Sequence, residues 1–279
     1  RRPDASELMK DDMQGLSGMN PEEQKVIKDV KDNLDMLHTI LCGPPGCGKS
    51  TVAVIIGEIY SALGFLDPEK EMKKVGHSDF TAGYLGQTEE KTRELLEESL
   101  GGVLFFDEAY SLGAAGIGNS DDYGRSAADT ITGYLTQHKH DFVMIIAGYE
   151  KDLNTRFFTL NQGLRRRFSW KFTIDKYTAK ELKLIFEQMA EKSGYTFTEP
   201  IPEQWFQTHM DLFPNFGGSM ETLLSKAKIV QGRRAIFLPR DEQNNLTIKD
   251  LDKGIEMYKT HGDFELKAAQ KRITNQYFM

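Results

Sequence analysis

Residues 40–56 read ILCGPPGCGKSTVAVII, and this stretch decides the fold. An apolar run, residues 38–42, leads into a glycine-rich loop, and the apolar spacing of a buried helix follows. The loop matches the pattern G-x-x-x-x-G-K-[ST], whose backbone N–H groups wrap a phosphate while the lysine reaches the terminal phosphates. We therefore predict a P-loop that binds ATP through Gly43, Pro44, Pro45, Gly46, Cys47, Gly48, Lys49, Ser50 and Thr51.

The two cysteines of the chain, Cys42 and Cys47, both belong to this stretch. A zinc site needs about four ligands, and no Cys/His cluster in the sequence completes one here. We therefore interpret Cys47 as a variable loop residue and Cys42 as the end of a strand, rather than as a metal or redox pair. Two cysteines without a visible export signal fit a reducing, intracellular setting, so we expect a cytoplasmic location.

Composition narrows the class of protein. The 279 residues are 39% hydrophobic and 28% charged, which is typical of a soluble, globular chain. The formal net charge of −7 argues against a general attraction to nucleic acid. No apolar run approaches the roughly 20 residues that span a bilayer, so we expect no membrane partner.

A second motif supplies the carboxylates that hydrolysis needs. In GGVLFFDEAYSLG, residues 101–113, an apolar strand ends at Asp107 and Glu108. Open α/β sheets place ligand chemistry at the carboxyl ends of their strands. We predict that Asp107, with Ser50, holds Mg through water and that Glu108 orients or deprotonates the attacking water. The alternative is an ordinary helix start after a strand.

Strands alternate with helices up to Ile174. Further strands are predicted at residues 141–148 and 168–174, and helices at 88–100 and 124–137, which indicates an α/β fold with a parallel sheet covered on both faces. After Ile174 the pattern becomes helical, opening with Thr178 and Glu181 in the spacing of a capping box. We expect a smaller all-α lid domain over residues 175–260.

At this point the sequence resembles an AAA+ ATPase, most closely the CbbX/SpoVK-like group that includes red-type rubisco activases. The resemblance covers about residues 16–255 and is carried by GPPGCGKSTVA, FTAGYLGQTEEKTRELLEESLGGVLFFDEAYSL, DDYGRSA, FVMIIAGYEKDL and NQGLRRRF. It implies AAA+ architecture: an N-terminal extension, 1–15; a nucleotide-binding domain, 16–174; the lid, 175–260; and a C-terminal extension, 261–279.

The resemblance also assigns roles to single residues. Tyr84 falls at the pore-loop aromatic that grips a threaded polypeptide, although an ordinary loop tyrosine is the alternative. Tyr149 falls at a sensor position that is often Asn in the wider superfamily. Gly18 falls in the segment that lines the adenine pocket. Each of these residues is an expected contact of the ATP site or of the pore.

The resemblance also implies roles for arginines near the end of the α/β domain and for one position in the lid. Arg167 falls at the arginine finger, and the sequence leaves open whether Arg165 or Arg166 acts instead. Relatives often carry a lid arginine that senses the γ-phosphate, but this chain has Met220 there. The contact is therefore either missing or supplied by Lys226.

Together these features predict a magnesium-dependent ATPase that forms a ring, hexameric by resemblance, and acts as a chaperone by remodelling or threading a protein client. Rubisco is one such client by analogy. Two alternatives stay open. One is a nucleic-acid motor of the branch-migration type, which the acidic charge and Tyr84 disfavour. The other is a nucleotide-gated assembly scaffold with little turnover, which Met220 favours.

Overall fold

The computed structural model describes residues 36–113, 120–240 and 242–261. They divide into two compact units, of which one ends at Ile174 and the other begins at Asp175. Pro45–Cys47 group with the second unit, although they precede most of the first in sequence. We call these the sheet unit and the helical unit. The two predicted terminal extensions, 1–15 and 261–279, lie outside the described residues apart from the last residue of a helix, His261.

The sheet unit is built on parallel strands, as predicted. Within the described residues five strands pair in the order β2-β3-β4-β1-β5, and every pairing is parallel. Their bounds are β1 (Thr39–Cys42), β2 (Lys73–Val75), β3 (Val103–Phe106), β4 (Val143–Gly148) and β5 (Trp170–Thr173). Cys42 pairs with Gly148 and Phe106 with Ile146, so the loops that follow these strands leave from one edge of the sheet.

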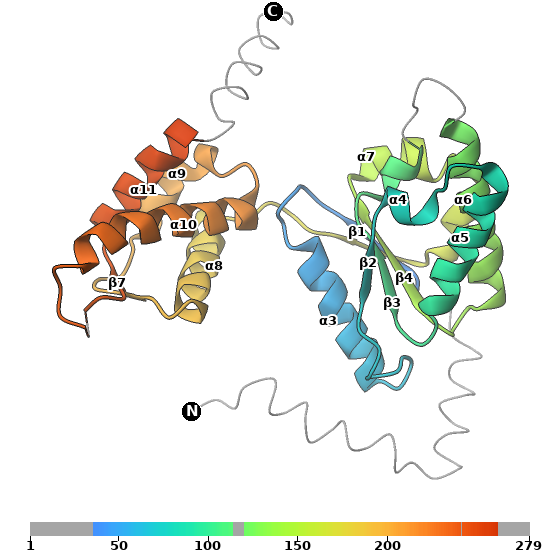
Figure 1. Ribbon diagram of the computed structural model, residues 1–279, viewed down its shortest axis with the longest axis horizontal. Helices are drawn as coiled ribbons and strands as arrows, with labels where there is room; N and C mark the ends of the chain where they lie inside the picture. The colour runs from blue at the N-terminus through green and yellow to red at the C-terminus, as the bar shows by residue number, and fades with distance from the viewer. Residues whose placement is uncertain (1–35, 114–119, 241, 262–279) are drawn as a thin grey trace, which may run out of the picture. The chain divides into compact units, whose positions relative to one another are not determined.

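Helices cover both faces of this sheet (Figure 1). Successive strand residues point to opposite faces, so Phe105 packs with α3 (Lys49–Ala62) while Phe106 packs with the core on the other face. That second core includes side chains of α5 (Leu85–Glu98) and α6 (Ser120–Gln137). Both phenylalanines are completely buried, and burial of such a side chain contributes about 1.5–3 kcal/mol.

Short elements follow the strands at the carboxyl edge. They are α4 (His77–Phe80), the 3₁₀ helix η2 (Ala109–Gly113), α7 (Glu150–Asp152) and the π-helical η3 (Leu153–Phe157). The 3₁₀ helix η4 (Leu164–Arg167) instead precedes the amino end of β5. Loops and short turns at this edge can present side chains to a ligand without disturbing the sheet. The predicted site residues Gly43, Asp107, Glu108 and Tyr149 directly follow β1, β3 and β4 at this edge.

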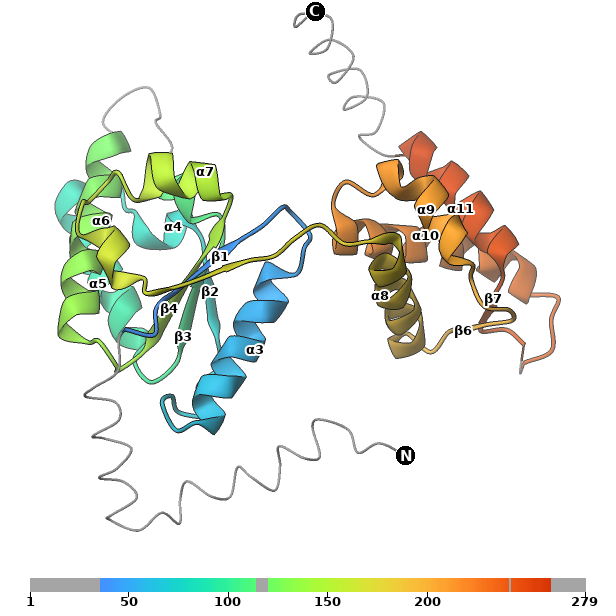
Figure 2. The same cartoon turned by 180° about the vertical axis from the view of Figure 1, so that it is seen from behind.

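The helical unit contains the expected helices (Figure 2). They are α8 (Ala179–Lys192), α9 (Glu203–His209) with the 3₁₀ helix η5 (Met210–Leu212), α10 (Phe216–Ala235) and α11 (Ile248–His261). The predicted capping box is present, because Thr178 and Glu181 bond each other's backbone N–H groups. A two-stranded parallel ladder, β6 (Thr196–Phe197) with β7 (Asn245–Leu246), was not predicted.

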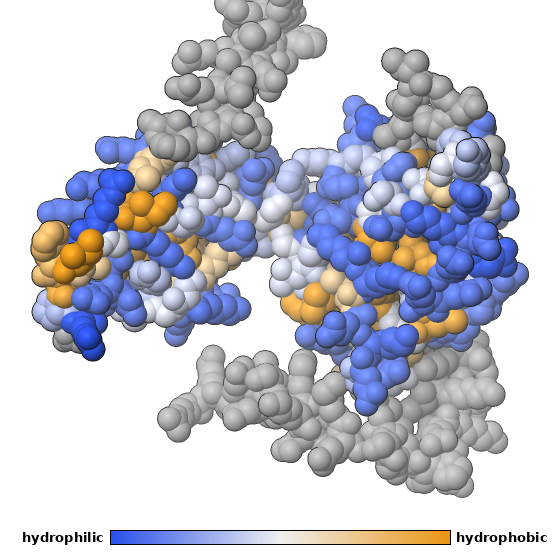
Figure 3. Space-filling view, in the orientation of Figure 1, coloured by the Kyte–Doolittle hydropathy of each residue, from blue (hydrophilic) through white to orange (hydrophobic). Residues whose placement is uncertain are grey.

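The surface is mainly hydrophilic, with scattered apolar patches (Figure 3). One group of exposed apolar side chains lies on α3: Val54, Ile55, Ile59 and Leu63. In the part of the chain that the structure describes, no helix is long and apolar enough to cross a membrane.

Candidate nucleotide-binding site

The predicted P-loop joins β1 to α3. Gly46 and Gly48 adopt left-handed conformations, with φ of 70° and 85°, which glycine reaches without steric cost. Helix α3 begins at Lys49, and in the described structure no side chain caps its N-terminus and no acidic residue occupies its first turn. The first N–H groups of the helix are therefore available to an anion, which the helix dipole also favours.

Lys49 is folded back into this loop. Its side chain is buried, with 7% of the residue exposed. Its Nζ donates hydrogen bonds to the carbonyl oxygens of Gly43, at 3.2 Å, and Pro44, at 3.0 Å. The ammonium group thus lies inside the loop that the sequence predicts to wrap phosphate, and its partners there are neutral carbonyls.

The tip of the loop is held by residues of the helical unit, to which it belongs by its contacts. The N–H of Gly217 donates to the Gly46 carbonyl oxygen at 3.0 Å, and the Tyr177 hydroxyl donates to the Cys47 carbonyl oxygen at 2.8 Å. A Cβ on Gly46 would lie 1.9 Å from the Asn215 carbonyl oxygen, so only glycine fits at this position.

Cys42 is the last residue of β1, and Cys47 lies in the loop that follows. Both side chains are buried, and burial raises the pKa of the Cys42 thiol. Within the described ranges, no group of three or more His, Cys, Asp or Glu side chains is placed to hold a metal ion.

Asp107 and Glu108 follow β3 at the carboxyl edge of the sheet. Asp107 is half-buried, and its Oδ1 accepts a hydrogen bond from the Glu108 N–H at 3.1 Å. This bond fixes one carboxylate oxygen and leaves Oδ2 for a cation. Glu108 has a φ of 52°, an uncommon left-handed conformation for a residue with a Cβ.

The environment of Glu108 suits a proton acceptor. Burial raises the pKa of its carboxyl, the charges of Asp107 and Asp152 act in the same direction, and Lys49 opposes them. A general base works best when its pKa lies near the operating pH, so a raised value brings this carboxylate closer to that range. The two neighbouring carboxylates therefore suit different roles.

One side chain that the sequence interpretation missed also enters this site. The Nζ of Lys74, on β2, lies 3.1 Å from Asp107 Oδ2 and 3.4 Å from Ser50 Oγ. Ser50 and Asp107 are the residues predicted to hold magnesium, and both offer the hard oxygen ligands that this ion prefers. Both oxygens already lie close to one positive charge, the Lys74 ammonium, so the residues present fit a magnesium ion. A lysine near the carboxyl end of an edge strand was the available sequence signal.

Tyr84 is exposed, with 72% of its surface accessible, and it occupies the N-cap position of α5 without a side-chain capping bond. Its neighbour Gly83 is held by a hydrogen bond that the Tyr123 hydroxyl donates to the Gly83 carbonyl oxygen at 3.2 Å. Tyr149 is partly exposed just before α7, with its ring centroid 6.5 Å from that of Tyr110. The pore and sensor roles of Tyr84 and Tyr149 stay predictions.

The three arginines of η4 differ in their contacts. Arg167 donates from Nε and Nη2 to the Thr136 hydroxyl, at 3.1 and 2.9 Å, and from Nη1 to the Gly163 carbonyl oxygen. Arg165 stacks over the Phe158 ring at 5.2 Å. Arg166 is exposed; its backbone N–H donates to the Gly163 carbonyl oxygen at 3.3 Å, and its side chain has no hydrogen bond or ion pair within the described residues. The finger role predicted for Arg167 stays a prediction, and Arg166, whose side chain is exposed, stays the alternative that the sequence left open.

The lid position identified in the sequence is a core position. Met220 on α10 is 0% exposed and packs in the apolar core of the helical unit. Lys226, one and a half turns further along α10, is half-buried. Gly18, the predicted adenine contact, lies outside the described residues.

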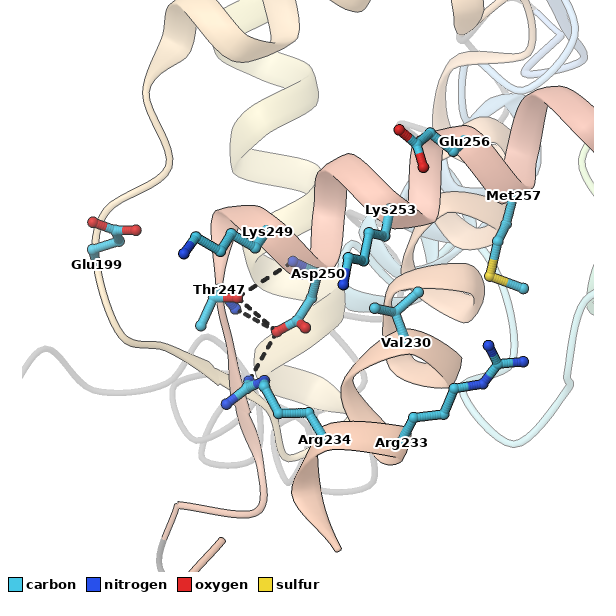
Figure 4. A pocket seen from close by; sticks show the side chains of 10 residues that line it. All are labelled: Glu199, Val230, Arg233, Arg234, Thr247, Lys249, Asp250, Lys253, Glu256 and Met257. Carbon is cyan, nitrogen blue, oxygen red and sulfur yellow. Dashed lines mark hydrogen bonds and ion pairs between the residues drawn. The ribbon is translucent and has the colours of Figure 1, made fainter. Parts of the chain in front are cut away.

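A separate hollow of about 860 Å³ lies within the helical unit (Figure 4). Its wall joins α10 to α11, and an ion pair of 2.9 Å between Arg234 Nη2 and Asp250 Oδ2 closes its base. None of the residues predicted to bind nucleotide lines it. This hollow is therefore distinct from the P-loop and the carboxylates.

The residues that carry the β2-β3-β4-β1-β5 sheet match a known family. The model of the ATPase family associated with various cellular activities (AAA) matches residues 39–176. Residues 39–176 are an AAA ATPase domain. The solved AAA domain of FIGL-1 in complex with ADP shares its fold, with a TM-score of 0.55, 18% identity, and coverage of 84% of this chain and 77% of that one.

Curated relatives of the AAA domain confirm the predicted resemblance to the CbbX/SpoVK-like group. A cfxQ-like protein of Acanthamoeba polyphaga mimivirus is 34% identical over 86% of this chain and 62% of its own length. Stage V sporulation protein K of Bacillus subtilis is 33% identical over 63% of this chain and 53% of its own length. The ESX-3 secretion system protein EccA3 of Mycolicibacterium smegmatis is 41% identical over 57% of this chain.

The chain spans only part of these relatives. It matches 62% of the viral protein and 26% of EccA3. The match extends over 256 residues of the viral protein and 160 residues of EccA3. What the longer relatives do as whole proteins does not transfer to this chain by similarity alone.

Proposed function

We propose that this chain is a magnesium-dependent ATPase that forms a ring, hexameric by family resemblance, and uses ATP hydrolysis to remodel or thread a protein client. The observation that carries the proposal is the convergence of Ser50 Oγ and Asp107 Oδ2 on one cation, the Lys74 ammonium. Glu108, whose pKa is raised, adjoins this place. Ser50 Oγ and Asp107 Oδ2 come from different elements of the fold, and their approach to one cation supports a binding site.

In this proposal each residue has one task. Lys49 and the N–H groups of residues 46–50 hold the phosphates, Ser50 and Asp107 hold magnesium, and Glu108 takes a proton from the attacking water or orients it. Bound magnesium supplies positive charge that offsets the charge developing on the phosphoryl group. The Asp107 Oδ1 bond to the Glu108 N–H keeps the two carboxylates in fixed relation.

Two variants test the chemistry. Lys49→Ala is expected to lose nucleotide binding, because Lys49 contacts the ground-state phosphates. Glu108→Gln is expected to keep binding and lose turnover, because the amide cannot accept the proton. Glu94→Gln, the same change on the exposed face of α5, serves as the matched control. ATP turnover in Glu108→Gln that equals turnover in Glu94→Gln would refute the assignment.

The ring and the client need separate measurements. Glu108→Gln with ATP is expected to assemble into a hexamer, which native mass spectrometry measures directly. Turnover of the parent protein is expected to rise with an unfolded protein such as casein and to ignore duplex DNA. Stimulation by DNA alone would favour the branch-migration alternative. The chain has only two cysteines, Cys42 and Cys47, which is consistent with a reducing, cytoplasmic setting for this activity.

One observation favours a second candidate, a nucleotide-gated scaffold with little turnover. Met220 is completely buried, so the lid position that carries a phosphate-sensing arginine in many relatives cannot contact a nucleotide from where it packs. A scaffold would assemble with ATP and hydrolyse it slowly. Single-turnover measurements on the assembled protein separate this candidate from the motor.

A further inference from the structure

Lys74 is set apart from an ordinary surface lysine by what it contacts. Exposed lysines commonly form single ion pairs of little energetic weight. The Lys74 Nζ instead meets the carboxylate of Asp107, at 3.1 Å, and the hydroxyl of Ser50, at 3.4 Å. These come from different elements, the end of β3 and the first turn of α3.

The position of Lys74 on β2 directs it to this place. Lys74 pairs in register with Phe105, and its Nζ lies 5.6 Å from the centre of that ring. Lys73, the preceding residue, points to the other face of the sheet and forms an ion pair with Glu98 at the end of α5. Because successive side chains of a strand point to opposite faces, Lys74 points to the candidate metal site and Lys73 points away from it.

We propose that Lys74 is a built-in counter-ion of the metal site, which holds the place of magnesium while nucleotide is absent and must withdraw when the magnesium–nucleotide complex binds. The inference rests on the proposed function, because it concerns the same ligands. Two cations cannot share one carboxylate oxygen and one hydroxyl at close range, since like charges repel. Lys74 therefore competes with magnesium and raises the concentration of the ion needed to fill the site.

Two features keep the withdrawn state accessible. More than half of the Lys74 side chain is exposed, and its flexible stem lets the ammonium return to water. The ion pair with Asp107 is partly exposed as well, so its strength stays within the range measured for surface pairs. The lysine thus neutralises Asp107 in the empty protein without blocking the site.

The test is the magnesium dependence of nucleotide binding, measured with a fluorescent ADP analogue and needing no turnover. Lys74→Met keeps the apolar stem and removes the charge, and Lys73→Met is the matched control on the neighbouring residue. We expect Lys74→Met to lower the magnesium concentration for half-maximal binding by about fivefold, the upper range for a partly exposed ion pair. Lys73→Met is expected to match the parent, and circular dichroism checks that both variants fold.

The outcomes separate this inference from the proposed function. An unchanged magnesium midpoint in Lys74→Met overturns the counter-ion role and leaves the ATPase proposal intact. A raised midpoint, or weaker binding at saturating magnesium, would make Lys74 a nucleotide ligand and also overturn it. If the parent binds no nucleotide at any magnesium concentration, the proposed function fails and the inference fails with it.

Discussion

Replacing Glu108 by glycine is expected to remove turnover and yet to give a more stable protein than replacing it by alanine. The φ of 52° places Glu108 in the left-handed region, where a Cβ costs about 1–2 kcal/mol relative to glycine. Glycine also lowers the stability of the folded protein by about 0.5–1 kcal/mol relative to alanine, because it has greater conformational freedom in the unfolded chain. With mid-range values, the free energy of unfolding of Glu108→Gly is therefore expected to exceed that of Glu108→Ala by about 0.7 kcal/mol.

A matched pair on α5 gives the opposite sign. Glu94 is exposed in the middle of that helix, where glycine is less stable than alanine by about 1 kcal/mol. The contrast between the two positions is therefore about 1.7 kcal/mol, which urea unfolding resolves. The two tryptophans of the chain lie in different units, so a Trp205→Phe background leaves Trp170 as a reporter on the sheet unit.

The result that refutes this reasoning is a glycine penalty at position 108 equal to that at position 94. Such a penalty would mean that the backbone at Glu108 is relaxed in solution. Turnover is lost in both Glu108 variants, so stability and activity are read independently. A gain in stability on loss of the carboxylate would place the strain at the residue that performs the chemistry.

Three further predictions follow from the site and the core. Tyr84→Ala is expected to keep the melting temperature and basal turnover, because the side chain is 72% exposed, and to lose remodelling of a client; a lower melting temperature with remodelling intact would exclude the pore role. Arg167→Ala is expected to bind ATP, hydrolyse it poorly, and regain activity when mixed with Lys49→Ala in shared rings. Recovery with Arg166→Ala instead would assign the finger to Arg166, whose side chain has no hydrogen bond or ion pair within the described residues. Burial holds the pKa of His38 at about 3, below its unfolded value of 6.5, so the folded state resists protonation and stability is lost as the pH falls below 6.5. Between pH 7 and pH 5 this loss is about 2 kcal/mol in urea unfolding, and His38→Asn, which does not titrate, should lack it.

The parts of the fold that the sequence predicted are those written in short, local patterns. The strand before Gly43 and the strand before Asp107 are unbroken apolar runs, and a parallel sheet follows from their alternation with helices. The boundaries were less accurate, since the predicted strand 141–148 begins at Val143 and the predicted helix 88–100 begins at Leu85. Loop residues that begin a helix carry no apolar signal of their own.

What the sequence did not predict depends on residues that are distant along the chain. Lys74 joins Ser50 and Asp107 only because β2 lies next to β3, an order that no local pattern contains. The β6-β7 ladder involves two residues a strand, which is too short to show a period. The left-handed backbone of Glu108 was also unforeseen, because Glu is not a residue that marks such a turn.

The carbonyl partners of Lys49 bear on the rate at which a product leaves. The Lys49 ammonium donates hydrogen bonds to the carbonyl oxygens of Gly43 and Pro44, so the loop itself supplies hydrogen-bond acceptors for this charge. A diphosphate departing from this loop need not leave a bare buried cation behind, because the lysine exchanges one set of oxygens for another. The same exchange limits how tightly a nucleotide is held, since each bond to phosphate replaces one that the protein already makes. A P-loop whose own carbonyl oxygens accept hydrogen bonds from its lysine is suited to repeated binding and release of a nucleotide rather than to its permanent retention.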